Sequence, residues 1–313
     1  MSRRVAIIGM GLIGRSWAVD FARAGARVAL WDAMDGIVES SMIQIRQLVS
    51  DMEGARLLNE TPEIILSHIN PCSTLSEALS GADYIQENTP ERIEIKHDVF
   101  AAIEANAQPD AVIASSTSGL LPSAMFENLA SARRCLVAHP LNPPHLIPAV
   151  ELVPGPATDA ASLHTARMIL EEAGHVVLTL RREIAGFVMN RLQGAVLDEA
   201  FRLVEQGIVG PEDVDIALRD GLAIRWSVVG PFETIDLNAP GGVSDYIDRY
   251  GPMYDELAIG SEGRADWKGP VRDLVAADRR ARLAVDQIPA RTEWRDARLA
   301  EIARNYLDKR EKL

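Results

Sequence analysis

Residues 5–14 read VAIIGMGLIG, an apolar run that passes directly into the pattern Gly-x-Gly-x-x-Gly. In such a pattern Gly9 permits a tight turn, Gly11 lets the backbone approach a pyrophosphate, and Gly14 lets a helix pack against a strand. Residues 15–24 are compatible with that helix, whose N-terminal amides would attract phosphate charge. A purely structural turn would explain the glycines but not the order of strand, turn and helix around them. The segment therefore predicts a dinucleotide-binding turn.

A second apolar run, residues 27–31, ends in Asp32, which lies 18 residues after Gly14. A carboxylate at this point can accept hydrogen bonds from the ribose diol of an adenosine. The following residues, Ala33-Met34-Asp35, include no Arg or Lys that could pair with a 2′-phosphate, and Asp35 would repel one. The sequence therefore predicts NAD, rather than NADP, as the cofactor.

The bulk properties of the chain are those of a globular protein. Of its 313 residues, 47% are apolar and 25% are charged, and the net charge is −13. This acidity argues against nucleic acid or an anionic membrane as a partner, and no apolar stretch approaches the ~18–20 residues that span a bilayer. Cys72 and Cys135 show no metal-ligand spacing, so we predict neither a disulfide framework nor a metal site. With the first strand under way by Val5, we expect no signal peptide and a cytoplasmic protein.

The first 180 residues alternate between strand-like and helix-like segments. This alternation is typical of an α/β fold with a doubly wound, mostly parallel sheet of the Rossmann type. Strands are predicted at residues 4–9, 27–31, 67–70, 83–86, 111–115, 134–138, 149–153 and 175–180. Helices are predicted at residues 13–24, 36–58, 92–106 and 159–173.

The character of the sequence changes after Gly186. Apolar residues recur at near-helical spacing over residues 187–206, which predicts a long, largely buried helix. Residues 211–313 carry further helical patterns and no strand alternation. We therefore predict an NAD-binding domain over residues 1–184 and an all-α domain over residues 185–313. A helical domain of this kind often supplies a subunit interface, so we expect a homodimer that pairs through it.

A dinucleotide fold does not define the reaction, which must come from a site at the carboxyl ends of the strands. The first candidate is the turn SSTSG at residues 115–119, which follows a predicted strand. Its hydroxyl groups can face the cofactor and hold a substrate oxygen. The alternative is a Ser/Thr-rich turn that only caps the next helix.

The second candidate is His139, which follows the predicted strand 134–138 and opens the loop HPLNPP. Twelve residues later, Glu151 lies inside the apolar strand 149–153, where a carboxylate is costly unless it has a partner. The imidazole of the neighbouring strand would be that partner. Such a pair orients a general base and stabilises its protonated form. A structural histidine and a glutamate at the surface edge of the sheet are the alternative.

The third candidate is Asn190, in the sequence GFVMNR at residues 186–191. It lies in the first turn of the predicted long helix, at the junction of the two domains. There its amide can meet a substrate oxygen, or it can be an ordinary polar position.

Together these residues resemble the L-3-hydroxyacyl-CoA dehydrogenase superfamily. The resemblance runs through the glycine motif, ENTPE at residues 87–91, the Ser-rich turn, the HPLNP loop and the GFxxNR helix start. It implies an NAD-dependent oxidation of a 3-hydroxy substrate. The family's catalytic pattern falls on Ser118, His139, Glu151 and Asn190, and its cofactor contacts fall on Leu12, Ile13, Asp32, Glu91 and Lys96.

Within the superfamily, the chain is most similar to the L-gulonate 3-dehydrogenase branch, which is related to lambda-crystallin. The segments that carry this likeness are the HPLNPP loop with Ile147-Pro148, residues 220–234, and Trp294-Arg295-Asp296. The acyl-CoA branch usually has Phe at the position of Leu141 and Asn at the position of Ser116. The resemblance therefore favours a free L-3-hydroxy acid over a CoA thioester.

The candidate substrate contacts are then Ser118, Asn142, Asn190 and Arg225. An arginine can bind a carboxylate through two hydrogen bonds, although an ordinary surface ion pair is the alternative for Arg225. Short-chain L-3-hydroxyacyl-CoA dehydrogenase and L-carnitine dehydrogenase are alternative activities. A non-catalytic, crystallin-like protein that binds NAD is a more distant one.

Overall fold

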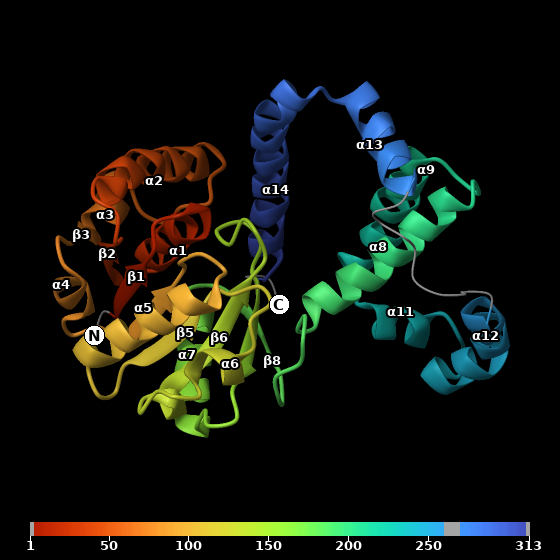
Figure 1. The fold of residues 1–313 in the computed structure, drawn as a ribbon. Coiled ribbons are helices and arrows are strands. Elements are labelled where there is room, and N and C mark those ends of the chain that lie inside the picture. Colours follow the sequence, from red (N-terminus) through yellow and green to blue (C-terminus); the bar gives the residue numbers. More distant parts are fainter. Residues whose placement is uncertain (1–2, 260–269, 311–313) are drawn as a thin grey trace. The chain divides into compact units, whose positions relative to one another are not determined.

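The computed structural model describes residues 3–259 and 270–310. The chain forms two compact units, Met1–Asn190 with Ala290–Leu313, and Arg191–Pro289. The first unit is built on an eight-stranded sheet with the order β3-β2-β1-β4-β5-β6-β7-β8 (Figure 1). Its strands are β1 (Arg4–Ile8), β2 (Arg27–Trp31), β3 (Ile69–Pro71), β4 (Tyr84–Glu87), β5 (Val112–Ser115), β6 (Cys135–Pro140), β7 (Ala149–Pro154) and β8 (Val176–Thr179).

Neighbouring strands of this sheet are parallel except β6 and β7, which are antiparallel. All eight strands lie within two residues of their predicted limits, so the doubly wound α/β fold is confirmed. The strand order reverses between β1 and β4, because β1 pairs with β2 on one side and with β4 on the other. Cofactors bind outside the carboxyl ends of the strands at such a point.

The strands are apolar on both faces because helices cover both. In β1, Val5 and Ile7 contribute to one core while Ala6 and Ile8 contribute to the other. Continuous apolar runs of this kind are expected in parallel strands that are buried on both sides. The pattern explains why the sequence shows runs rather than strict alternation.

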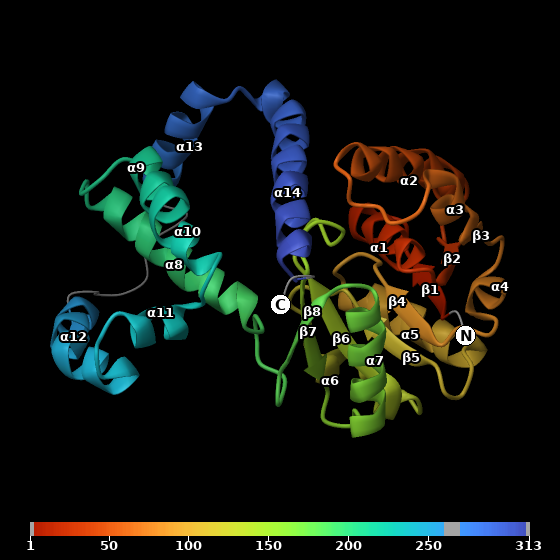
Figure 2. The same cartoon turned by 180° about the vertical axis from the view of Figure 1, so that it is seen from behind.

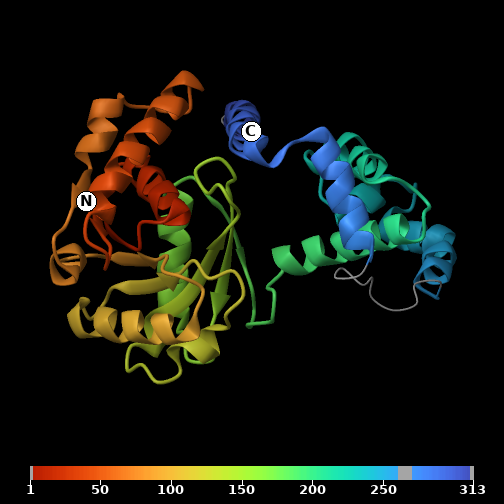
Figure 3. The same cartoon turned by 45° about the horizontal axis from the view of Figure 1, so that its top comes forward.

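Two helical layers enclose the sheet. The layer on one face comprises α1 (Leu12–Arg23), α2 (Ile37–Gly54), α3 (Pro62–Ser67) and α7 (Ala160–Glu172), whose buried side chains share one core. Ala300 of α14 (Ile288–Arg310) is buried in the same core. The opposite layer comprises α4 (Leu75–Leu79), α5 (Ile93–Asn106) and α6 (Pro122–Phe126), which share the other. Helix α5 lies in front of the sheet in Figure 1, and α7 lies in front of it in Figure 2, which is seen from behind. Figure 3 shows α1 in red and α5 in gold with the sheet between them.

The helix predicted over residues 36–58 is shorter in the structure. It ends at Gly54, after which Arg56 adopts a left-handed conformation with φ of 58° and the chain turns toward α3. The three short helices α3, α4 and α6 were not predicted, because five or six residues are too few to show a helical period.

The second unit is helical, as expected. It contains most of α8 (Met189–Glu205), followed by α9 (Pro211–Ile216), the π-helix η2 (Ala217–Leu222), α10 (Ala223–Trp226), α11 (Pro231–Leu237), α12 (Gly242–Ile259), α13 (Pro270–Arg282) and the 3-10 helix η3 (Val285–Gln287). The expectation that α8 is largely buried is wrong for the single chain, because Leu192 is 63% exposed and Val196 is 37% exposed.

The described limits of the two units differ from the predicted domain limits in two respects. Residues 185–190 belong to the first unit, whereas the sequence places them in the helical domain. Residues 290–313 belong to the first unit, and Ala300 on α14 is buried in its core, whereas the sequence places them in the helical domain. The predicted domains, 1–184 and 185–313, stay a prediction.

Three further properties bear on function. None of the helices within the described residues combines the length and apolar character that crossing a membrane requires. Cys72 and Cys135 are both buried and carry free thiols. Across residues 3–259 and 270–310, no group of three or more His, Cys, Asp or Glu side chains is arranged to hold a metal ion.

Candidate active site

The turn between β1 and α1 has the shape that its glycines predict. Gly9 has a φ of 89°, and a Cβ there would lie 2.9 Å from the carbonyl carbon of Asn88. A Cβ on Gly14 would lie 2.0 Å from the carbonyl oxygen of Gly9, so only glycine lets the helix approach the turn. At Gly11, by contrast, a Cβ would meet nothing within 4 Å. The protein leaves open the position where the motif predicts close approach of a pyrophosphate.

Helix α1 begins at Leu12 with Gly11 as its N-cap residue. Its first hydrogen bond joins the amide of Arg15 to the carbonyl oxygen of Gly11 at 3.1 Å. The amides of Leu12 and Ile13 come before this bond and can bind an anion. No acidic side chain occupies the first turn, where it would compete with a phosphate. The turn fits the pyrophosphate of NAD.

Asp32 lies directly after β2, where it is tied to the same turn. Its carboxylate accepts hydrogen bonds from the amide of Met10 at 2.8 Å and from the amide of Met34 at 2.9 Å. One bond to each oxygen leaves lone pairs free, so the carboxylate can still accept a ribose diol. The geometry fits the adenosine end of NAD.

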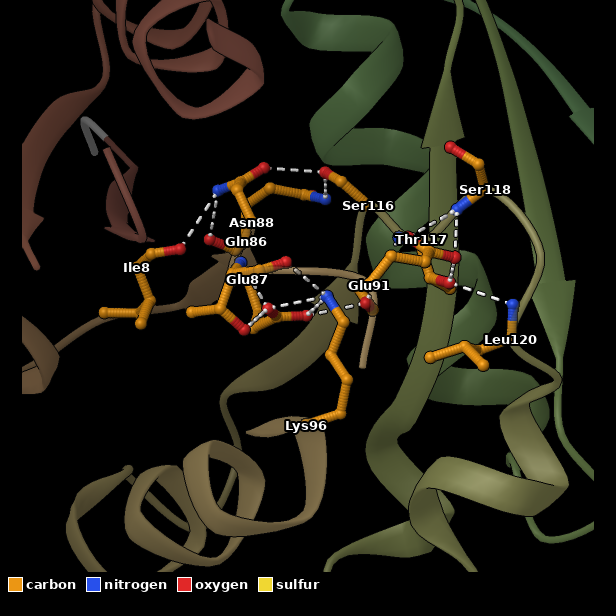
Figure 4. A network of polar contacts seen from close by, with 12 residues as sticks. Ile8, Gln86, Glu87, Asn88, Glu91, Lys96, Ser116, Thr117, Ser118 and Leu120 are labelled. Carbon is orange, nitrogen blue, oxygen red and sulfur yellow. Dashed lines mark hydrogen bonds and ion pairs between the residues drawn. The ribbon is translucent and has the colours of Figure 1, made fainter. Parts of the chain in front are cut away.

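A buried ion pair lies at the end of β4 (Figure 4). The Nζ atom of Lys96 is 2.8 Å from both carboxylate oxygens of Glu87 and 3.0 Å from the carbonyl oxygen of Thr89. Ser115 adds a hydrogen bond to Glu87 at 2.6 Å. Because an ammonium group has three N–H donors, these contacts use all of them. Lys96 therefore ties α5 to β4, and this geometry leaves it no free donor for the cofactor contact that the resemblance implies.

Glu91 fixes the conformation of the Ser-rich turn. Its carboxylate accepts hydrogen bonds from the hydroxyl group of Thr117 and from the amides of Ser118 at 3.0 Å and Gly119 at 2.9 Å. Burial alone would raise the pKa of Glu91, but these bonds and the charge of Lys96 outweigh it, so the pKa lies below its ordinary value. In Figure 4 the amide of Ser118 faces Glu91 while its hydroxyl group points away. The hydroxyl group makes no hydrogen bond to any residue that the structure describes, and that it binds a substrate stays a prediction.

Ser116 joins the Ser-rich turn to the glycine turn. Its hydroxyl group accepts hydrogen bonds from Trp17 at 3.0 Å and Gln86 at 2.7 Å, and donates one to Asn88 at 2.7 Å. The amide group of Asn88 in turn donates to the carbonyl oxygen of Ile8 at 3.3 Å. These bonds use the one donor and two acceptor sites of a hydroxyl group. Ser116 is therefore part of the framework and has no capacity left for a substrate.

His139 and Glu151 form the pair that the sequence predicts. They are directly opposite residues of the antiparallel strands β6 and β7, so their side chains share one face of the sheet. The Nδ1 atom of His139 is 2.7 Å from Oε2 of Glu151, and the two residues are 4% and 0% exposed. A ring that donates from Nδ1 keeps Nε2 as an acceptor, and Nε2 makes no hydrogen bond to any described residue. The pair has the form of an oriented base.

The second oxygen of Glu151 binds the start of α8. Oε1 accepts hydrogen bonds from the amides of Val188 at 2.7 Å and Met189 at 2.9 Å. Burial works to raise the pKa of Glu151, but the bond from His139 and these two amides reverse the effect, and the pKa is lowered. Glu151 therefore stays ionised and can stabilise an imidazolium.

Asn190 and Ser118 are brought together, since the side-chain amide of Asn190 donates to the carbonyl oxygen of Ser118 at 2.7 Å. Asn142 is exposed and lies two residues after the end of β6. Arg225 lies on α10 in the second unit, where it makes no ion pair with any residue among 3–259 and 270–310. That it binds substrate stays a prediction.

Several residues that shape the site were not singled out from the sequence. They are Glu87, Asn88 and Phe187. The segment ENTPE was noted only as a mark of resemblance, although a glutamate at the end of a buried strand requires a partner. That requirement was not applied to Glu87, and only the fold identifies Lys96 as its partner.

Sequence profiles of two protein domains cover most of the chain. The profile described as "3-hydroxyacyl-CoA dehydrogenase, NAD binding domain" matches residues 4–184, and the corresponding C-terminal domain matches residues 186–260. The chain belongs to the 3-hydroxyacyl-CoA dehydrogenase family. It is therefore an NAD-dependent oxidoreductase, and the glycine turn with Asp32 is the part of the fold that fits NAD.

Members of this family and related structures resemble the chain over nearly its whole length. A lambda-crystallin homolog of Bos taurus is 41% identical over 303 residues, covering 96% of this chain and 94% of its own. An L-carnitine dehydrogenase of Streptomyces coelicolor is 35% identical, with 88% and 91% covered. The crystal structure of FHMPC 5-dehydrogenase, an NAD+-dependent dismutase, has 28% identity and a TM-score of 0.81 over 98% of this chain and 99% of that one.

Proposed function

We propose that this dehydrogenase oxidises a free L-3-hydroxy acid of the L-gulonate type to the 3-keto acid. Two positions support a free acid over a CoA thioester, namely Leu141 and Ser116, which differ from the residues usual in the acyl-CoA branch. Similarity also supports it, because carnitine is itself a free 3-hydroxy acid and the substrate that gives FHMPC 5-dehydrogenase its name is a carboxylic acid.

The observation that carries the proposed chemistry is the His139–Glu151 pair. Nε2 of His139 would take the proton of the substrate hydroxyl group while the imidazole is held through Nδ1 by Glu151. Glu151 would stabilise the imidazolium that results. NAD, when bound, supplies the acceptor for the hydride. Positioned general-base catalysis of this kind contributes about 10²–10⁴-fold to the rate.

Ser118 and Asn190 would hold the substrate oxygen from which the proton leaves. The side-chain amide of Asn190 donates to the backbone carbonyl oxygen of Ser118 at 2.7 Å, so the two residues lie together at the turn after β5. Asn142 would add a contact from the loop after β6. Removal of one hydrogen-bond donor to a developing oxyanion costs about 10²–10³-fold in rate, which is the loss we expect for Ser118→Ala.

Arg225 would bind the carboxylate of the substrate. Its exposed guanidinium group has no acidic partner among the described residues, which favours this role over a surface ion pair. We expect Arg225→Leu to raise the KM for L-gulonate more than the KM for an uncharged analogue. Equal changes for both would exclude the carboxylate contact.

A substrate panel tests the proposal directly. L-Gulonate, 3-hydroxybutyryl-CoA and L-carnitine are each mixed with enzyme and NAD, and NADH formation is followed at 340 nm. We expect the highest kcat/KM for the free sugar acid. A higher value for 3-hydroxybutyryl-CoA or L-carnitine would assign the enzyme to one of the two alternatives, and NAD binding without turnover of any substrate would favour the non-catalytic reading.

We also infer a homodimer that pairs through the second unit. Large apolar side chains there are 62–79% exposed in the single chain, namely Ile208, Val228, Phe232, Leu237 and Leu257. Apolar surface on this scale marks a protein interface, and two-fold pairing with a second copy is the commonest way to cover it. Light scattering should give twice 34.2 kDa, and Phe232→Asp should shift the mass toward 34.2 kDa. A wild-type mass of 34.2 kDa would exclude the dimer.

A further inference from the structure

We propose that the turn from Gly186 to Met189 is a positioning element of the active site. Its backbone amides hold Glu151, and the ring of Phe187 holds the imidazole of His139, so that the start of α8 orients the pair. This inference rests on the proposed role of His139 as the base. It assigns a task to a segment that contributes no side chain to the proposed chemistry.

Both oxygens of the Glu151 carboxylate are used in hydrogen bonds. Oε2 is bound by His139 at 2.7 Å, while Oε1 is bound by the amides of Val188 at 2.7 Å and Met189 at 2.9 Å. Glu151 is 0% exposed, so water does not replace a lost partner easily. The carboxylate cannot rotate toward or away from the ring without breaking a hydrogen bond on its other oxygen. The two amides therefore fix the direction in which Glu151 presents Oε2.

The backbone of the turn has an unusual conformation. Gly186 has a φ of 75° and Phe187 a φ of 48°, so two consecutive residues are left-handed. A bulky residue seldom adopts this conformation, and such outliers persist where the surroundings impose them, often at functional sites. Here the two residues turn the chain so that the next two amides both face Glu151. An extended chain at this point would direct successive amides to opposite sides.

The side chain of Phe187 packs against His139. It is 0% exposed, and its ring centroid is 5.5 Å from that of His139 with an angle of 55° between the planes. This is a packed aromatic contact that limits how far the imidazole can tilt. The same turn therefore contacts both members of the pair, one through backbone amides and the other through a ring.

The arrangement has a consequence for the charge on Glu151. The groups that shift its pKa are His139 from β6 and the amides at the start of α8. An amide that donates to a carboxylate withdraws charge from it and so weakens its attraction for a neighbouring imidazolium. Loss of one amide should therefore strengthen the attraction of Glu151 for an imidazolium and raise the pH of the acidic limb of the kcat/KM profile. A merely structural turn would change stability without moving this pH.

The test compares Met189→Pro with Met189→Ala. Met189 is the first residue of α8, where proline is tolerated because no intrahelical partner is lost, so Met189→Pro removes the N–H group with little harm to the helix. Met189→Ala shortens the side chain but retains the N–H group. For each variant we would measure kcat, the pH profile of kcat/KM and the binding of NAD to the substrate-free protein.

We expect kcat of Met189→Pro to be roughly tenfold below that of Met189→Ala, since small misplacements of a catalytic group are costly, and the acidic limb of its pH profile to lie at higher pH. NAD binding should be the same in both variants. Identical pH profiles would overturn the proposal. If Met189→Pro does not fold, Phe187→Leu replaces it. A folded Phe187→Leu variant with the kcat of the wild type would overturn the proposal that this turn orients His139.

A parallel measurement on His139→Gln separates the test of His139 as the base from the test of the turn as its positioning element. If His139→Gln retains turnover, the assignment of the base fails, and the positioning element has nothing to position. If His139→Gln is inactive while the two Met189 variants behave alike, the base stands and only the present inference fails.

Discussion

Two buried acid–base pairs involve strands of the same sheet and differ in how completely their hydrogen-bonding groups are used. In the Glu87–Lys96 pair, the ammonium group makes three hydrogen bonds and has no further donor. In the His139–Glu151 pair, Glu151 is fully bound but the ring keeps one nitrogen free of contacts with the described residues. Both pairs are inaccessible or nearly so, at 0–4% exposure.

The comparison shows that burial and charge alone do not mark a catalytic pair. Lysine has one charged group, and once all its N–H donors are used in hydrogen bonds the pair has only a structural role. Imidazole has two nitrogens, so one can be held while the other exchanges a proton. We therefore expect loss of the first pair to affect folding and loss of the second to affect turnover.

The largest expected effect is that of His139→Gln on turnover. Removal of the free nitrogen should lower kcat by about 10²–10⁴-fold, because the proton of the substrate hydroxyl group has no acceptor. The dissociation constant of NAD, measured by fluorescence, should change little because the glycine turn is untouched. A variant with near-normal kcat would remove His139 from the mechanism.

The next largest effect is that of Lys96→Met on stability. It leaves the buried carboxylate of Glu87 without its counter-charge, which should lower the free energy of unfolding by about 3–5 kcal/mol. Urea denaturation followed by circular dichroism measures this loss. The double variant Glu87→Gln/Lys96→Met, which removes both charges, should recover part of it. An unchanged unfolding midpoint for Lys96→Met would show that the pair is not structural.

Glu151→Gln should have a smaller but diagnostic effect. The amide keeps the shape of the side chain but removes the charge that stabilises the imidazolium, so kcat should drop by roughly 10²-fold, within the range of general-base effects. The acidic limb of the pH profile of kcat/KM should therefore move to lower pH. This is opposite to the shift expected for Met189→Pro. A shift to higher pH would contradict the assigned role of Glu151.

The smallest effect concerns acid stability. The pKa of Glu151 is lowered in the folded protein, so its ionised form contributes stability that is fully present above the ordinary value of 4.5 and is lost as the pH falls through the lower folded value. Wild-type protein should lose stability across this window, measured as unfolding midpoints between pH 6 and pH 3. The loss should be smaller in Glu151→Gln, which cannot titrate. Equal losses in the two proteins would mean that Glu151 is not a source of the pH dependence.

The strands, the glycine turn and the contact between His139 and Glu151 could be predicted from the sequence. Their signals are local: apolar runs, fixed glycine spacing, and a carboxylate inside a strand that must have a partner. The antiparallel pairing of β6 and β7 then places the two side chains opposite each other. The twelve-residue separation alone could not fix that register.

Other parts of the site could not be predicted, because they depend on backbone direction or on distant partners. Nothing in the sequence shows that Phe187 is left-handed, so the amides that bind Glu151 were not foreseen. Lys96 was expected at the cofactor, and only the folded chain shows its ammonium group fully bound by Glu87 and Thr89. The burial of α8 was predicted from its apolar stripe, but a stripe does not reveal whether its own chain or another covers it.

Turnover and unfolding free energy, measured on the same preparations of His139→Gln and Lys96→Met, test the central claim most directly. The account predicts that His139→Gln loses turnover at an unfolding free energy close to that of the wild type. It predicts that Lys96→Met has a lower unfolding free energy than the wild type. Expressed as a free energy, the accompanying loss of turnover per folded molecule should be smaller than this loss of stability. The opposite pattern, an active His139→Gln or a Lys96→Met as stable as the wild type, would contradict the distinction between the catalytic His139–Glu151 pair and the structural Glu87–Lys96 pair.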